Sequence, residues 1–234
     1  MSPASLADRF VQLLGLTTRP IALAFTDVPP AGLARVASPA PAGCGYWKRA
    51  AAGECFYTVP EDHLGCAVGA HTHGVPLGPE GQKELAGLVE TMVGLAYLTL
   101  DDVAKIPVRR EGFGALSYGP LGELDLAPDV VLVRGSPRAG MLLAEACHAA
   151  GVRGDHAPVL RPACGMVPEV LSSRRAADSF GCIGNRVYTD LPDGEAWFAL
   201  PGSAVEAVAE RLEVLVTANR ELERFHRDRA RAAV

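Results

Sequence analysis

The chain has 234 residues, of which 49% are hydrophobic and 21% charged, with a formal net charge of -5. This composition is typical of a globular protein, and the length fits one sizeable domain or two small ones. The negative charge, with no basic block outside the mixed-charge stretch 220–231, argues against a nucleic-acid partner.

Neither a membrane span nor a secretion signal is expected. No apolar run approaches the ~18 residues that a membrane-spanning helix needs. Asp8 and Arg9 interrupt the apolar pattern near the N-terminus, where a signal peptide would be continuous. We therefore expect a cytoplasmic protein with no membrane partner.

The first half of the chain combines predicted helices and strands with glycine-rich segments. Apolar residues at helical spacing predict helices over residues 6–14, 47–52 and 79–94. Short apolar runs predict strands over residues 20–25, 54–59, 96–100 and 115–118. The segment 63–81 carries five glycines, two prolines and three histidines, so we expect it to be mostly irregular, and either functional or mobile.

The second half contains the clearest strand and the longest helix. A continuous β-branched run predicts a buried strand over residues 129–134, and Ser136 and Pro137 are typical of the helix start that follows it. Further predictions are a helix over 168–172 and a hairpin of strands 187–189 and 196–200. A Ser203-x-x-Glu206 capping box opens a long amphipathic helix.

These elements predict the α/β class, with a mixed α+β arrangement as the alternative. We expect a single compact domain over residues 1–234, with a mixed sheet and a long C-terminal amphipathic helix. Residues 217–234 form a polar helical tail in this prediction.

Four cysteines stand beside glycines in segments without helical pattern: Cys44, Cys66, Cys164 and Cys182. Glycine lets the backbone approach a bulky group closely, and thiolates are ligands for zinc and for iron–sulfur clusters. The alternative is that these are small buried residues, as free cysteines often are. Cys147 lies on the apolar stripe of a predicted helix and is interpreted as core, while Cys55, in a predicted strand, is intermediate.

Histidines and arginines accompany the cysteines. His71 and His73 would share one face of a strand, as zinc or non-haem iron sites require, although histidines in glycine-rich loops are usually solvated. Arg186 follows Cys182, and Arg161 precedes Cys164. Either guanidinium could hold a carboxylate or phosphate, with a surface turn as the alternative for Arg186.

The sequence resembles a family of bacterial and archaeal proteins called domain of unknown function 169. The likeness covers about residues 8–216, and its most specific part is Ser-x-Gly-Cys-x-Gly-x-Arg at residues 179–186. Other points of likeness are the segments 19–25, 44–50, 53–66 and 128–132, Cys164, and Pro201 with its helix. The resemblance implies that the four glycine-flanked cysteines are recurrent positions and that Cys55 and Cys147 are not. It implies no activity, because the family is uncharacterised.

The leading hypothesis is an iron–sulfur protein whose cluster, of the [4Fe–4S] type, is held by Cys44, Cys66, Cys164 and Cys182. It would transfer electrons to a partner protein or reduce a small anionic molecule held by Arg186 and Arg161, as an oxidoreductase. The alternatives are a zinc or thiol-redox protein that uses the same cysteines, and a non-catalytic small-molecule sensor without a cofactor.

Overall fold

The computed structural model describes residues 3–154, 159 and 161–232. Within these residues, six strands form one sheet in the order β2-β3-β1-β4-β6-β5, and all its neighbouring strands run antiparallel. The strands are β1 (Ile21–Thr26), β2 (Phe56–Thr58), β3 (Ala115–Pro120), β4 (Val130–Gly135), β5 (Ala177–Ser179) and β6 (Ala196–Pro201).

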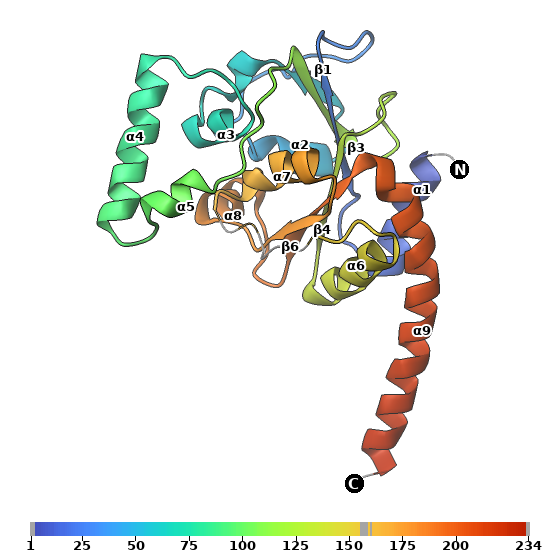
Figure 1. Cartoon of the computed structure of the whole chain (residues 1–234). Coiled ribbons are helices and arrows are strands. Elements are labelled where there is room, and N and C mark those ends of the chain that lie inside the picture. The colour runs from blue at the N-terminus through green and yellow to red at the C-terminus, as the bar shows by residue number, and fades with distance from the viewer. Residues whose placement is uncertain (1–2, 155–158, 160, 233–234) are drawn as a thin grey trace.

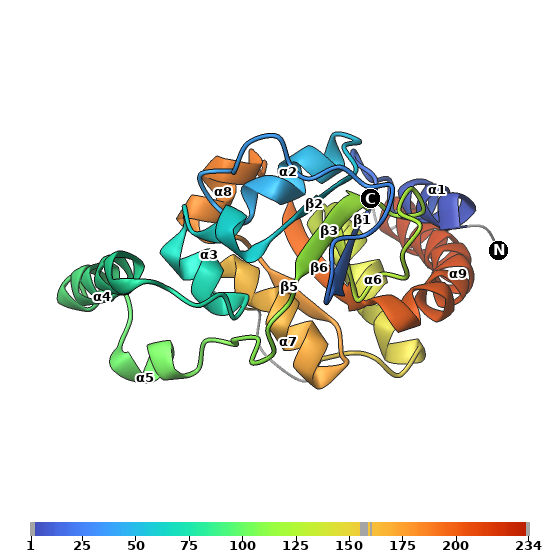
Figure 2. The same ribbon diagram turned by 90° about the horizontal axis from the view of Figure 1, so that it is seen from above.

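Helices cover both faces of the sheet, which gives three layers (Figures 1 and 2). One face carries α1 (Pro3–Leu14), α6 (Pro137–Ala149) and α9 (Val205–Ala232). The opposite face carries α2 (Gly45–Ala51), α3 (Ala67–Thr72), α7 (Met166–Ser173) and α8 (Ile183–Thr189). Two further helices extend beyond this second face: α4 (Pro79–Gly94) and α5 (Leu100–Ala104).

The central strands supply both cores by alternation. Along β4, Val131 and Val133 belong to the core under α1, α6 and α9, whereas Val130 and Leu132 belong to the core on the opposite face. Successive side chains of a strand point to opposite faces, so a continuous apolar run is what a strand covered on both sides needs. Burying each such side chain contributes roughly 1.5–3 kcal/mol.

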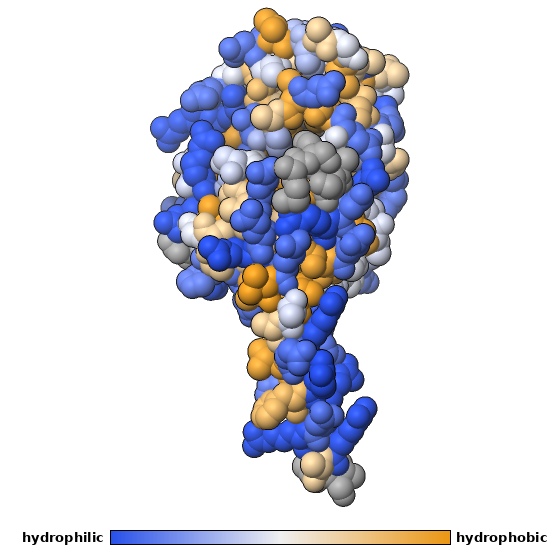
Figure 3. Space-filling model, turned by 90° about the vertical axis from the view of Figure 1, so that its right-hand side faces the viewer, coloured by the Kyte–Doolittle hydropathy of each residue, from blue (hydrophilic) through white to orange (hydrophobic). Residues whose placement is uncertain are grey.

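The predicted mixed α/β class is confirmed, in its α+β form, because the strands pair antiparallel. The predictions for residues 6–14, 79–94, 129–134 and 196–200 correspond to α1, α4, β4 and β6. The long C-terminal helix is also confirmed as α9, whose residues are buried only as far as Val216. Beyond that point the helix leaves the body and its surface is mainly hydrophilic (Figure 3).

The strand predicted over residues 96–100 is wrong, because this segment turns and then starts a helix. Thr99 caps α5: its hydroxyl accepts a hydrogen bond from the Asp102 N–H, and the Asp102 carboxylate accepts one from the Thr99 N–H. Such a reciprocal capping box satisfies two backbone donors at the helix start, and this local gain outweighs the strand propensity of the segment.

The strand predicted over residues 187–189 is also wrong, because these residues end the helix α8. The buried residues of α8 are Asn185 and Thr189, four apart, and the Thr189 hydroxyl donates to the Asn185 carbonyl. In a strand Val187 would lie on the same face as these two residues, but it is exposed, so the burial has helical periodicity. The short helix α3 likewise lies within the segment 63–81, which we expected to be mostly irregular.

A search of the helices in the described residues for membrane spans found none with the length and apolar character to cross a bilayer.

Candidate functional site

Each of the four glycine-flanked cysteines lies where a helix begins. Cys44 directly precedes α2, Cys66 precedes α3, and Cys182 precedes α8. Cys164 lies in the short 3-10 turn Ala163–Gly165, which leads into α7. The first N–H groups of a helix have no partner four residues back within the helix. At Cys66 one of them, the Gly69 N–H, donates to the cysteine sulfur, whereas at Cys44 the first three N–H groups of α2 donate to the carbonyls of Ala42, Gly43 and Cys44.

These four cysteines line a single cavity of about 440 Å³ on the α2, α3, α7 and α8 side of the sheet. They come from four segments that are far apart in the sequence, and the fold brings them together. The rest of the lining is largely apolar and includes Val68, Leu85, Leu88, Val89, Met92, Leu98, Val103, Ile106 and Ile183. A concave, mostly apolar site with a few convergent polar groups is the usual form of a ligand or cofactor site.

Two of the sulfurs have hydrogen-bonding neighbours within the site. The Gly69 N–H donates to Cys66 Sγ at 3.3 Å. Thr72 Oγ1 lies 3.3 Å from Cys164 Sγ, and the Thr72 hydroxyl also donates to the Gly69 carbonyl at 2.9 Å. The helix α3 therefore orients two cysteines at once, one through its first turn and one through its last residue.

Burial keeps the Cys44 and Cys164 thiols protonated at neutral pH unless a cation compensates. Burial, with smaller contributions from the neighbouring Cys182 and Cys66, raises the pKa of Cys44 to about 12, while the Asn185 side chain opposes the shift. Burial also raises the pKa of Cys164, with further contributions from Cys44, Cys66 and Cys182. The sulfurs thus lie close enough to influence one another, and a bound metal centre is the kind of charge that converts buried thiols to thiolates.

Asn185 is the polar side chain that the fold leaves without a partner in this cavity. It is 2% exposed, and neither its amide nitrogen nor its amide oxygen has a hydrogen-bond partner among the described residues. It lines the cavity and lowers the pKa of the Cys44 thiol, which places the amide beside that sulfur. A buried unsatisfied amide costs roughly 1–3 kcal/mol, and this amide is placed to donate to or accept from a group in the cavity.

His71 and His73 do not share one face, as they would on a strand. His71 lies in the helix α3 and His73 caps its C-terminal end, where residues two apart face different directions. His71 is exposed and lines the cysteine cavity, whereas His73 is buried and its Nδ1 bonds to the Gly69 carbonyl at 2.8 Å. Within residues 3–154, 159 and 161–232, no group of three or more His, Cys, Asp and Glu is placed to hold one metal ion.

His63 and His73 form a second buried polar pair beneath this site. Their rings are 5.8 Å apart and stacked, and His63 Nε2 lies 2.9 Å from the Thr58 hydroxyl. Burial lowers the pKa of His63 to about 3, with a further lowering from His73, and burial also lowers the pKa of His73. Both rings are therefore neutral at ordinary pH and serve the packing below the cavity.

The two predicted arginines both line the larger cavity described below, but only Arg161 also lines the cysteine cavity. Arg161 lines the cysteine cavity, and its guanidinium lies 4.3 Å from the centre of the Tyr97 ring. Arg186 is not among the described residues that line this cavity. Its guanidinium donates to the carbonyls of Leu191 and Pro192 and lies 3.6 Å from Asp193. The expectation that Arg186 faces the cysteine sulfurs is corrected accordingly: it holds the turn after α8.

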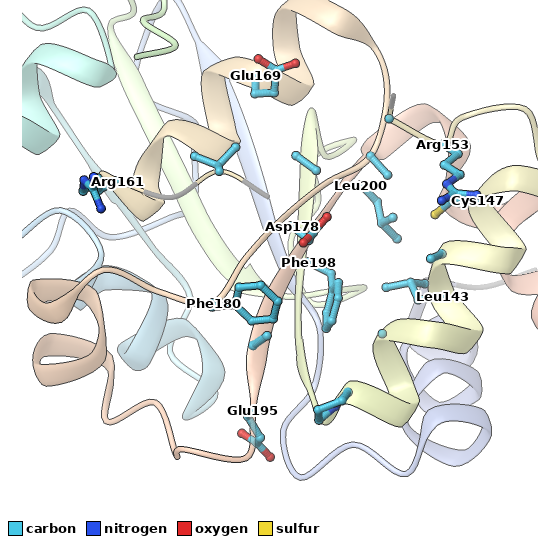
Figure 4. A pocket seen from close by; sticks show the side chains of 18 of the residues that line it. Leu143, Cys147, Arg153, Arg161, Glu169, Asp178, Phe180, Glu195, Phe198 and Leu200 are labelled. Atoms are coloured by element: carbon cyan, nitrogen blue, oxygen red, sulfur yellow. The ribbon is translucent and has the colours of Figure 1, made fainter. Parts of the chain in front are cut away.

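A second, larger cavity of about 880 Å³ lies between α6 and the β6 and β5 edge of the sheet (Figure 4). Leu143 of α6 and Phe198 of β6 form its apolar side, while Asp178 and Glu169 bring carboxylates to it. It contains charges of both signs, and Arg161 lies between the two cavities because it lines both.

Cys147 and Cys55 lie apart from the four-cysteine cavity. Cys147 is 2% exposed, belongs to the core under α1, α6 and α9, and borders the larger cavity. Burial alone raises its pKa to about 12. Cys55 Sγ lies 3.8 Å from the Glu123 carbonyl, at the edge of the same core. The interpretation of Cys147 as a core residue agrees with this placement.

Sequence reasoning did not identify three parts of this site: Thr72, Asn185 and the apolar face of α4. The spacing of Leu85, Leu88, Val89 and Met92 predicts the helix correctly, but gives no sign that its apolar stripe faces a cavity. Thr72 and Asn185 carry no such signal, because polar side chains are usually exposed and their burial depends on the tertiary structure.

Comparisons with known proteins give one match. Neither the curated proteins nor the solved structures contain a match to this chain. A family model matches residues 9–211, and its description is DUF169, uncharacterised ArCR, COG2043. Because this match spans most of the sequence, including all four cysteines of the cavity, the chain belongs to the DUF169 family.

Proposed function

We propose that the protein binds an iron–sulfur cluster, of the [4Fe–4S] type, through Cys44, Cys66, Cys164 and Cys182, and acts in cytoplasmic electron transfer or reductive chemistry. The observation that carries this proposal is that four cysteines from four separate segments line one largely apolar cavity. A four-iron cluster takes one thiolate for each iron, so four convergent cysteines match its needs.

The residues around the sulfurs fit an anionic, sulfur-rich group. The cysteines stand at the starts of α2, α3, α8 and the turn before α7. The Gly69 N–H already donates to Cys66 Sγ, and the unpartnered Asn185 amide lies beside Cys44. Hydrogen bonds to cluster sulfurs and to thiolates tune the reduction potential of such a centre.

The apolar lining supports the same proposal. The carbon side chains of α4, α5 and Ile183 shield the cysteine sulfurs from water, and no Asp or Glu belongs to the described lining. Burial and exclusion of solvent protect a cluster and influence its potential. When bound, the cluster would supply one-electron transfer, while the chain holds it, keeps water away and places a partner molecule beside it.

The proposal is tested by the absorption spectrum of anaerobically purified protein. A bound cluster gives a broad band near about 400 nm that fades on reduction with dithionite. A colourless protein containing stoichiometric zinc would overturn the proposal in favour of a zinc or thiol-redox protein. A colourless protein without metal, even after anaerobic reconstitution with iron and sulfide, would leave a small-molecule sensor as the better interpretation.

A further inference from the structure

We propose that the cysteine cavity binds an amphipathic anion: a molecule with an apolar body that packs against α4 and one anionic group that pairs with Arg161. This inference rests on the proposed function for the chemistry at the cysteine end, and it names the class of ligand that the same site would take. The binding itself requires only the cavity and the two features described below.

The first feature is the apolar wall formed by α4. No residue of this helix is buried, yet Leu85, Leu88, Val89 and Met92 line the cavity on one side of the helix. The helix stands away from the sheet, beside α3 and α5, so this face packs against no layer of the core (Figures 1 and 2). An apolar stripe that faces a cavity and not a core offers its area to a ligand, and burial of that area drives binding.

The second feature is the guanidinium of Arg161. It has no hydrogen bond or ion pair with a carboxylate in the described part of the chain, and its recorded contact is the stacking over Tyr97. No Asp or Glu belongs to the described lining, and the pKa of the nearby Asp102 is lowered chiefly by its own capping bonds to Thr99 and only weakly by Arg161. The stacked guanidinium therefore has N–H groups that can bind an anion. Their planar arrangement allows two parallel hydrogen bonds to a carboxylate or phosphate.

The size and polarity of the cavity fix the rest of the ligand. Its volume of about 440 Å³ lies at the lower end of ordinary small-molecule sites. Besides Arg161 and the cysteines, the polar contributions are few: His71, Thr72, Tyr97, Asn185 and Tyr188. A sugar or a nucleotide has many hydroxyl groups and charges to satisfy, whereas an apolar chain or ring with one carboxylate or phosphate matches this lining.

The test is calorimetric titration of the anaerobically purified protein with octanoate, octyl phosphate, octanamide and acetate. The inference expects octanoate or octyl phosphate to bind at least about tenfold more tightly than octanamide, which lacks the charge, and acetate to bind too weakly to measure. The tighter of the two anions identifies the preferred headgroup. Equal affinity for octanamide and both anions, or no binding of any probe, would overturn the inference.

Two variants test the Arg161 guanidinium separately from the apolar face of α4. Arg161→Gln should lose about 10- to 100-fold in affinity for the anion and leave octanamide unchanged, because it removes charge-assisted hydrogen bonds. Leu88→Gln should weaken both, and since α4 buries no residue this change tests the cavity and not the core. The controls Arg110→Gln and Glu84→Gln, which alter exposed residues outside the lining, should bind like the parent protein. Unchanged anion affinity in Arg161→Gln would contradict the inference.

Iron and sulfide are measured in the same samples, so that the two proposals fail separately. Selective anion binding by a protein that holds no cluster would support the ligand class and refute the proposed function. A full cluster in a protein that binds none of the probes would refute the ligand class and leave the proposed function standing.

Discussion

The two faces of the sheet differ in what they bury, although helices cover both. The face under α1, α6 and α9 buries mainly aliphatic side chains. The opposite face buries the four-cysteine cavity together with Trp47, Tyr118 and Trp197, whose polar atoms have no hydrogen-bond partner among the described residues. Most buried polar atoms in proteins are paired, and local rules fail chiefly at functional sites. The first face therefore has the composition of an ordinary core, whereas the second has the buried unpaired polar atoms that the proposed site would require.

Two cysteines make the contrast sharp. Cys147 and Cys164 are both buried, and burial raises the pKa of both thiols. Cys147 is surrounded by the aliphatic core, whereas Cys164 contacts Thr72 and shares its cavity with three other cysteines. Burial alone thus does not distinguish a structural cysteine from a proposed ligand, and our proposal rests on the shared cavity.

The largest expected effect comes from removing a cysteine of the cavity. Cys164→Ala should lower the iron and acid-labile sulfide of anaerobically purified protein at least about tenfold, because even residues outside the ligand sphere change metal affinity 10- to 100-fold. The matched control is Cys147→Ala, which should keep the metal content of the parent protein. Equal metal content in the two variants would contradict the proposal that only the face with the cysteine cavity binds the cluster.

The second prediction concerns acid stability of the cysteine face. The pKa of buried His63 is lowered to about 3, from 6.5 in an unfolded chain, so the unfolded state binds more protons between these values. Stability therefore falls as the pH drops from 6.5 towards 3, by about 1.4 kcal/mol per pH unit for this residue. His73 adds to the loss with the same sign, while the charge of Asp62 opposes the shift at His63.

Urea unfolding of the metal-free protein at a series of pH values measures this slope. His63→Gln can keep the bond to Thr58 but cannot titrate, so its free energy of unfolding should fall less steeply below pH 6.5. His148→Gln, on the exposed side of α6, should keep the parent slope. A His63→Gln slope equal to that of the parent protein would show that this buried histidine does not weaken the fold in acid.

A smaller effect is expected on the aliphatic face. Cys147→Ala removes one sulfur from a packed core and should lower the free energy of unfolding by roughly 1 kcal/mol in urea titrations, with the absorption spectrum unchanged. Loss of colour in this variant would mean that the cofactor site extends to the α6 side of the sheet. That result would contradict the assignment of the site to the opposite face.

The smallest expected effect is a change in reduction potential. Asn185→Leu removes the buried amide beside Cys44 and should shift the potential of the bound cluster downward, since donors to the sulfurs favour the reduced, more negative state. The iron content should be retained, because no ligand is lost. Redox titration followed by absorption measures the shift, with Asn219→Leu on α9 as the control, and an unchanged potential in Asn185→Leu would count against the amide's role.

The sequence predicts the parts of this molecule that depend on local patterns. The run at residues 129–134 identifies β4, and the apolar periodicity after Ser203 identifies α9, although Ser203 itself lies in the 3-10 turn Gly202–Ala204 that precedes the helix. The four cysteines could be singled out by their glycine neighbours and by the family likeness, although their meeting in one cavity depends on tertiary structure.

The failures have physical causes at particular residues. The sequence around Val187 and Tyr188 has strand propensity, but the burial of Asn185 and Thr189 makes it helical. Arg186 follows Cys182 closely in sequence, yet one helical turn directs it to the carbonyls of Leu191 and Pro192. Arg161 reaches the cysteine cavity because of its position in the tertiary structure, which no local pattern encodes.

The central claim is that the cysteine face of the sheet holds an iron–sulfur cluster. Its most direct test is the iron, sulfide and zinc content of anaerobically purified protein, expressed per chain. The account predicts about four irons and four acid-labile sulfides per chain, as a [4Fe–4S] cluster requires, and no stoichiometric zinc. One zinc per chain without sulfide, or a metal-free chain that takes up no iron on reconstitution, would contradict it.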